Sequence, residues 1–214
     1  MRVYGLVVAA GLGTRFGGGK LMAKWQDREL LGHVLLKLGS ARAAGLVAGT
    51  VVVHREEDDA VRALATEYRC MPVSVGTQDP ELSASLQTGL RALAGRGSSF
   101  DRQAALICLG DQPMLRLDVI SALVEAWNRT TAPIVRPSYR DDPGRPGHPI
   151  LIARSVWPLA SELRGDTGFN TLFEIRRMTV RTVSVAGTNP DIDTPDDLRA
   201  LDAATQPAPQ GSGA

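Results

Sequence analysis

Short apolar runs alternate with amphipathic segments from the N-terminus to about residue 127. The apolar runs have the length of strands and lie at residues 3–8, 50–54, 72–75 and 104–109. The amphipathic segments have the three- and four-residue apolar spacing of helices that pack on one face, at residues 30–44, 58–68, 83–94 and 117–127. Because parallel strands need crossover connections, this order predicts a mostly parallel sheet with helices on both faces.

The rest of the chain is less regular. We expect strands at residues 133–137, 149–152 and 179–185, and helices at residues 154–163, 167–176 and from Thr194 onward. Thr194 and Asp197 have the spacing of a capping box, with Pro195 at the first helical position. From Gln206 the chain is mostly Pro, Gly, Ser and Ala, which predicts a disordered tail (206–214) after a single domain (1–205).

The first predicted strand runs directly into a glycine-rich loop, and residues 9–20 read A-A-G-L-G-T-R-F-G-G-G-K. Glycines let backbone N–H groups turn toward an anion, and Arg15 and Lys20 add positive charge. Phe16 at the third glycine position argues against the dinucleotide fingerprint, and Thr14 replaces the first glycine of a Walker loop. The loop therefore predicts binding of a nucleoside triphosphate, against the simpler interpretation of a strand-to-helix turn.

Two aspartates lie where parallel sheets bind ligands, beyond the carboxyl ends of strands. Asp111 follows the strand at residues 104–109, and Asp193 precedes the last predicted helix. At a phosphoryl site Mg²⁺ usually takes one or two protein carboxylates. Asp111 either binds this metal or caps the helix that follows it. The capping box leaves Asp193 without a structural explanation, so Asp193 could join Asp111 on the metal.

Polar residues at two other predicted boundaries are weaker candidates. Ser83 is expected to cap the third helix, and Ser85 in its first turn could contact a base or a ribose. Gly147 and His148 lie where a Pro- and Gly-rich loop enters a strand. A lone histidine is more often structural than functional, so both interpretations of His148 stay open.

Composition narrows the function classes further. A net charge of +1 gives no bulk attraction toward nucleic acid or a membrane surface. The two cysteines, Cys70 and Cys108, do not have the spacing of zinc or iron–sulfur ligands. The chain shows no signal-peptide pattern and no apolar segment near the roughly 20 residues that span a bilayer. We therefore expect a soluble, cytoplasmic protein.

Taken together and in order, the motifs resemble the MobA-like nucleotidyltransferase superfamily, and most closely its molybdenum cofactor cytidylyltransferase branch. The resemblance extends over residues 6–201 and rests on the glycine-rich loop, S-L-x-x-G-L (85–90), L-G-D-x-P (109–113) and D-x-D-T-P-x-D-L (191–198). It implies an α/β protein with a Rossmann-like three-layer α/β/α nucleotidyltransferase fold and a mostly parallel sheet. It also implies Mg²⁺-dependent transfer of CMP from CTP to a molybdopterin-type cofactor, with release of pyrophosphate.

The resemblance assigns roles to individual residues. It implies that the nucleotide contacts Ser85, Asp111 and the loop residues Ala9, Ala10, Gly11, Leu12, Gly13, Thr14, Arg15 and Lys20. Among these, Arg15, Lys20 and Asp111 would be catalytic, and Asp111 and Asp193 would bind the metal. Guanine-using relatives carry L-A-G-G at the start of this loop, so the sequence A-A-G at residues 9–11 indicates CTP.

The acceptor is expected near the irregular loop of the second half, at Arg145, Gly147, His148 and Asp166. A phosphate nucleophile is already ionised at pH 7, so catalysis would consist of positioning and charge neutralisation. Two alternatives stay open. One is a nucleotidyltransferase with another phosphorylated acceptor, such as a phosphosugar. The other is a non-catalytic protein that binds the molybdenum cofactor and delivers it to a client molybdoenzyme.

Overall fold

The computed structural model describes residues 1–96, 102–144 and 147–205. A seven-stranded sheet has the order β5-β4-β1-β6-β8-β7-β9. Its strands are β1 (Arg2–Ala9), β4 (Thr50–His54), β5 (Met71–Ser74), β6 (Gln103–Leu109), β7 (Ile134–Tyr139), β8 (Ile150–Ala153) and β9 (Val180–Val185). Strand β8 is antiparallel to both β6 and β7, and the other neighbouring pairs are parallel. The predicted mostly parallel sheet is therefore confirmed.

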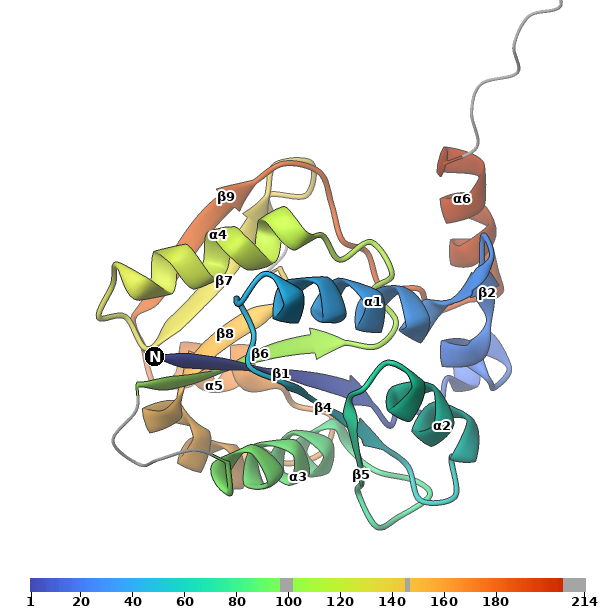
Figure 1. Ribbon diagram of the computed structural model, residues 1–214, viewed down its shortest axis with the longest axis horizontal. Helices are drawn as coiled ribbons and strands as arrows, with labels where there is room; N and C mark the ends of the chain where they lie inside the picture. Colours follow the sequence, from blue (N-terminus) through green and yellow to red (C-terminus); the bar gives the residue numbers. More distant parts are fainter. Residues whose placement is uncertain (97–101, 145–146, 206–214) are drawn as a thin grey trace, which may run out of the picture.

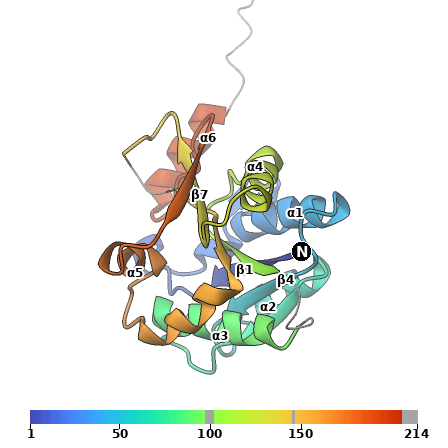
Figure 2. The ribbon, with the colours of Figure 1, turned by 90° about the vertical axis from the view of Figure 1, so that its left-hand side faces the viewer.

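Helices cover both faces of this sheet, as Figures 1 and 2 show. The helices α1 (Leu30–Ala43), α2 (Asp59–Glu67) and α4 (Leu117–Asn128) pack on one face. The other face carries α3 (Leu82–Ala94), the 3₁₀ helix η3 (Arg154–Glu162) and α5 (Phe169–Ile175). Successive side chains of a strand point to opposite faces, so Leu6 and Val7 of β1 belong to different apolar clusters. The result is the predicted three-layer α/β/α architecture.

The central strands are buried on both faces, which explains why they read as continuous apolar runs. Leu6 and Val7 of β1 and Leu106 of β6 are fully buried. Helix α3 approaches β1 closely at Gly89, where an added Cβ would overlap the Leu6 side chain. The backbone of α3 is thereby held directly against the strand that leads into the glycine-rich loop.

Several segments gather at the carboxyl ends of β1 and β6, which pair in register through Val8 and Leu109. They are η1 (Thr14–Phe16), η2 (Lys20–Met22), the hairpin β2 (Lys24–Trp25) and β3 (Arg28–Glu29), and α6 (Pro195–Thr205). A small apolar cluster joins the hairpin to α6 through Trp25, Leu30, Ile192 and Leu201. Figure 1 shows α6 beside β2 at one end of the molecule.

Two local predictions are corrected. Ser83 does not cap α3, because the helix begins at Leu82 with Glu81 at its N-cap. The first turn is instead held from another loop, where Asp166 Oδ1 accepts the N–H of Leu82 at 3.3 Å. The segment expected as a helix at residues 154–163 is a 3₁₀ helix with Pro158 inside it. Proline removes a helical hydrogen bond and disfavours regular α-helix at that point.

The predicted tail at residues 206–214 lies outside the described residues. Among the helices that the structure describes, none is both long and apolar enough to cross a membrane.

Candidate active site

The glycine-rich loop leaves β1 and forms the two short 3₁₀ helices η1 and η2 before the β2–β3 hairpin and α1. Gly13 and Gly19 precede η1 and η2, and both have φ of 62°, in the left-handed region where a Cβ is unfavourable. An added Cβ at Gly13 would also lie 3.0 Å from Cβ of Lys20. These glycines therefore allow the loop to fold back on itself and bring Lys20 to the end of the sheet.

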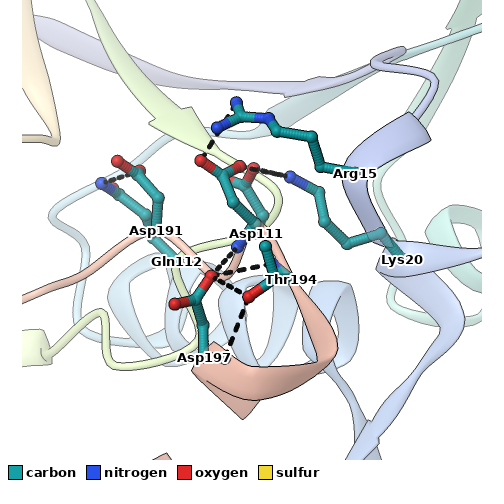
Figure 3. A network of polar contacts seen from close by, with 8 residues as sticks. Arg15, Lys20, Asp111, Gln112, Asp191, Thr194 and Asp197 are labelled. Atoms are coloured by element: carbon teal, nitrogen blue, oxygen red, sulfur yellow. Dashed lines mark hydrogen bonds and ion pairs between the residues drawn. The ribbon is translucent and has the colours of Figure 1, made fainter. Parts of the chain in front are cut away.

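Lys20 lies between two carboxylates that come from distant parts of the chain (Figure 3). Its Nζ is 2.5 Å from Asp111 Oδ2 and 3.1 Å from Asp193 Oδ1. Arg15 approaches the other oxygen of Asp193, with a guanidinium nitrogen 3.2 Å from Oδ2. The structure thus brings together four of the residues singled out in the sequence.

Burial makes this cluster electrostatically strong. The side chains of Lys20 and Asp111 are 12% and 19% exposed, whereas that of Arg15 is 74% exposed. Burial lowers the pKa of Lys20, but the carboxylates of Asp111 and Asp193 outweigh this effect and raise that pKa above its ordinary value. Burial also raises the pKa of Asp111 above its ordinary value, although the nearby ammonium of Lys20 opposes the shift. The ammonium of Lys20 is therefore the counter-ion that stabilises these two partly buried carboxylates.

The capping box of α6 is formed by Thr194 and Asp197 (Figure 3), and it also holds the backbone of the neighbouring Asp193. Asp197 Oδ2 accepts the backbone N–H groups of Asp193 at 3.0 Å and Thr194 at 2.8 Å. The Oγ1 of Thr194 accepts the N–H of Asp197 at 3.2 Å, which confirms the predicted box. The N–H of Ile192 also donates to the carbonyl of Asp111 at 3.0 Å. The segment before α6 is therefore tied directly to the end of β6.

The alternative role of Asp111 as a helix cap is wrong. Helix α4 begins at Leu117, its N-cap is Arg116, and no side chain caps it. Instead, Asp111 Oδ1 is buried and has no hydrogen-bond partner. A buried acceptor without a partner costs free energy, so this oxygen is suited to a cation that enters the site.

The donor set suits a hard divalent cation that also binds substrate phosphate. Asp111 and Asp193 supply two carboxylates, and Mg²⁺ beside phosphates usually takes one or two from the protein. Among the described residues, no three Asp, Glu, His or Cys side chains form a group that could hold a metal alone. The metal would therefore depend on the substrate for its remaining ligands.

A cavity of about 230 Å³ opens beside this cluster. It is lined by Leu109, Gln112, Tyr139, Asp142, Gly147, His148, Asn170, Thr188, Asn189 and Asp191. Gln112, the neighbour of Asp111, donates through Nε2 to Asp191 Oδ1 at 2.8 Å (Figure 3). Asn189 Nδ2 in turn donates to Gln112 Oε1 at 3.0 Å. Sequence reasoning missed Gln112 and Asn189, although Gln112 follows a strand end directly.

The residues expected to bind the acceptor do not all lie at one place in the structure. Gly147 and His148 line the cavity, but an added Cβ at Gly147 would lie 2.9 Å from both Pro137 and Tyr139. Packing against β7 therefore explains this glycine without a ligand. Asp166 instead lies at the first turn of α3, and Arg145 lies outside the described residues.

The residues expected to bind the nucleotide also differ in accessibility. Gly11, Leu12 and Thr14 are exposed and Gly13 is half-buried, whereas Ala9 and Ala10 are buried. Ser85 is buried too, and its Oγ donates to the carbonyl of Glu81 at 3.3 Å. The exposed part of the loop is therefore accessible to a ligand, and the hydroxyl of Ser85 already has a partner within α3.

The sequence and the fold of this chain are similar to those of known proteins. Residues 5–183 match the sequence profile of the MobA-like NTP transferase domain. The chain is 27% identical over 205 residues to the purine catabolism protein PucB of Bacillus subtilis, covering 91% of this chain and 93% of that protein. It is 33% identical over 145 residues to the 2-C-methyl-D-erythritol 4-phosphate cytidylyltransferase of Cereibacter sphaeroides, covering 64% of this chain and 58% of that protein.

Among solved structures, Rv0371c of Mycobacterium tuberculosis superposes with a TM-score of 0.75 at 29% identity, covering 95% of this chain and 99% of that one. A further structure of Rv0371c is a complex with manganese, and it superposes with a TM-score of 0.73 at 26% identity over 95% of this chain and 100% of that one. The fold and a divalent metal thus occur together in a similar protein.

Proposed function

The chain belongs to the MobA-like NTP transferase family, and from this premise we propose that it transfers CMP from CTP to a molybdopterin-type cofactor. One observation carries the proposal: Lys20 of the glycine-rich loop forms a single, partly buried cluster with Asp111 and Asp193. This arrangement supports the proposal because cationic groups, backbone N–H groups and carboxylate oxygens lie together at the end of the sheet, where a triphosphate with its metal would need them.

Each part of the cluster has a distinct task in this reaction. Arg15, which is largely exposed, and Lys20 would hold the β- and γ-phosphates and stabilise the leaving pyrophosphate. Asp111 and Asp193 would hold Mg²⁺, which supplies further charge neutralisation when bound. The terminal phosphate of the acceptor forms the new P–O bond to the α-phosphorus of CTP, while the bond between the α-phosphorus and the bridging oxygen of pyrophosphate breaks. The nucleophile is already ionised and needs no general base.

The position of Lys20 also supports a change of partners during the reaction, from the two carboxylates to the substrate phosphates. Without substrate, its ammonium neutralises both carboxylates at 2.5 and 3.1 Å. Asp111 and Asp193 would hold a divalent cation when one is bound, and that cation would supply the neutralising charge in place of the ammonium. Lys20 would then be free to contact the phosphates instead of the two carboxylates.

CTP is proposed as the nucleotide because residues 9–11 read A-A-G. Ala10 is fully buried, so its methyl group would act on the base by setting the position of the exposed residues that follow. Support also comes from the similar cytidylyltransferase of Cereibacter sphaeroides. The same relative favours the second candidate, in which the acceptor is a sugar-type phosphate, since its name gives 2-C-methyl-D-erythritol 4-phosphate as substrate.

A pyrophosphate-release assay tests both candidates. Each of CTP, GTP, ATP and UTP is combined with a molybdopterin-type cofactor or with 2-C-methyl-D-erythritol 4-phosphate, in the presence of Mg²⁺. We expect release with CTP and the molybdopterin acceptor, and its loss in Asp111→Asn. Release with the sugar phosphate alone would select the second candidate. No release with any pair would favour a cofactor-binding accessory protein.

A further inference from the structure

The cavity beside Asp111 contains a buried amide whose orientation is fixed by its neighbours. Asn189 Nδ2 donates to Gln112 Oε1 at 3.0 Å and to the carbonyl of His148 at 3.3 Å. The same carbonyl accepts the hydroxyl of Tyr139 at 2.8 Å. Carbonyl oxygens can only accept, so the amino group of Asn189 must face His148. A flipped amide would place two oxygens against each other.

This orientation leaves one acceptor of the amide without a partner. Asn189 is 8% exposed, and its Oδ1 is buried with no hydrogen-bond partner. Gln112 is held in the same manner, because its Nε2 is committed to Asp191 Oδ1 at 2.8 Å. Burial also raises the pKa of the Tyr139 hydroxyl well above its usual value, so Tyr139 stays a donor to His148. These hydrogen bonds fix the orientation of both amides. The atom that they leave without a partner is an acceptor, Asn189 Oδ1.

The rest of the lining has the same character. Asp142 and Asp191 add two carboxylates, and none of the described lining residues is Lys or Arg. Such a wall disfavours a phosphate and favours a group with N–H donors. A second cavity of about 200 Å³ adjoins it through Leu109, His148 and Asn170, and its other lining residues are mostly apolar. The two cavities together suit a flat ring with polar edges and apolar faces.

We propose that the cavity beside Asp111 binds the heterocycle of the acceptor, and that Asn189 determines specificity for a ring edge with an amino group and a ring N–H. An aminopyrimidinone, as in a pterin, has this edge. The inference rests on the proposed function. At about 230 Å³ the cavity is smaller than the roughly 300–1,000 Å³ of complete ligand pockets, as expected of a subsite. The phosphate arm would extend past Gln112 to its neighbour Asp111.

Two ring compounds test this assignment without nucleotide or turnover. Pterin carries a 2-amino group, which donates hydrogen bonds. Lumazine carries an oxygen at the same position, which can only accept them. Each is titrated against the full chain, with ring fluorescence and ligand-observed NMR as readouts. We expect pterin to bind at least tenfold more tightly than lumazine. Asn189→Ala should weaken pterin about tenfold and bring it close to lumazine, while the affinity for CTP with Mg²⁺ stays unchanged.

Asn128→Ala is the matched control, because Asn128 is exposed at the far end of α4. If Asn189→Ala does not fold, Asn189→Ser and the wild-type comparison of the two rings still decide. Equal affinity for both rings, or no binding of either at millimolar concentration, would overturn the assignment and leave the Asn189 oxygen to a water molecule. Selective pterin binding without any pyrophosphate release would instead retain the subsite and reject the proposed reaction.

Discussion

Replacement of Lys20 by alanine should separate the structural role of this residue from its role toward phosphate. In the free protein its ammonium contacts Asp111 at 2.5 Å and Asp193 at 3.1 Å. The variant leaves two carboxylates close together without their shared counter-ion. We therefore expect lower stability, lost turnover and, unusually for a loss of function, a gain in metal affinity.

The size of the effect follows from the burial of the three groups. One ion pair at 4 Å is worth about 4 kcal/mol at an effective dielectric constant of 20. Loss of one partner from a fully buried pair costs roughly 3–5 kcal/mol. The carboxylates of Asp111 and Asp193 are 19% and 33% exposed, so water recovers part of the loss. We expect about 2–3 kcal/mol, a decrease in Tm of roughly 4–12 °C for a domain of this size.

A divalent cation should reverse this loss in the variant. In the wild type the cation must first displace the Lys20 ammonium, whereas in Lys20→Ala the Asp111 carboxylate is open to it and Asp193 keeps the largely exposed Arg15 as its partner. Mn²⁺ should therefore bind the variant at least tenfold more tightly in calorimetric titrations without nucleotide. At a concentration a hundredfold above its Kd, it would restore about 2.7 kcal/mol.

Lys24→Ala is the matched control, since Lys24 is an exposed lysine on β2 close to the same loop. It should change neither Tm nor the affinity for Mn²⁺. The reasoning fails if Lys20→Ala binds Mn²⁺ no better than the wild type does, because the ammonium would then not compete with the metal.

Four further substitutions test the remaining roles. Asp111→Asn should keep the fold, measured by circular dichroism, and abolish Mg²⁺-dependent turnover. Asp193→Asn should reduce turnover less severely, and near wild-type rates at saturating Mg²⁺ in either variant would contradict metal binding there. Arg15→Ala should weaken all four triphosphates alike, about tenfold by calorimetry, because a charge-assisted contact contributes roughly 1.5–3 kcal/mol. Ala10→Gly should shift the ratio of kcat/KM from CTP toward GTP. An unchanged ratio would show that Ala10 does not determine which base is selected.

The core of the fold could be predicted from the sequence because buried parallel strands leave a local signature. The strands at residues 50–54 and 104–109 and the helix that starts at Leu30 were predicted within a residue or two of their observed ends. The direction of β8 was not predicted, since an apolar run reads the same in either orientation. The β2–β3 hairpin was missed because its strands have two residues each and are held by contacts with α6.

The candidate site was predictable where a residue directly follows a strand or lies in a local motif. Lys20 and Asp111 belong to such segments, and Thr194 with Asp197 forms a local capping pattern. Asn189 does not, because its partner Gln112 is 77 residues away and the surrounding loop has no regular pattern. The prediction for Ser83 failed for a similar reason, since the first turn of α3 is held from a distant loop.

If the proposed function holds, the division of charge across the site would set the direction in which the two substrates enter. The glycine-rich loop carries the exposed Arg15 and the releasable Lys20, and it suits the triphosphate. The cavity on the other side of Asp111 presents Asn189 and two carboxylates, and it suits the uncharged ring of an acceptor. Phosphates repelled by the cavity and attracted by the loop would then meet at Asp111, between the two regions. On this proposal, the end of β6 with regions of opposite charge on its two sides would be sufficient to orient both substrates.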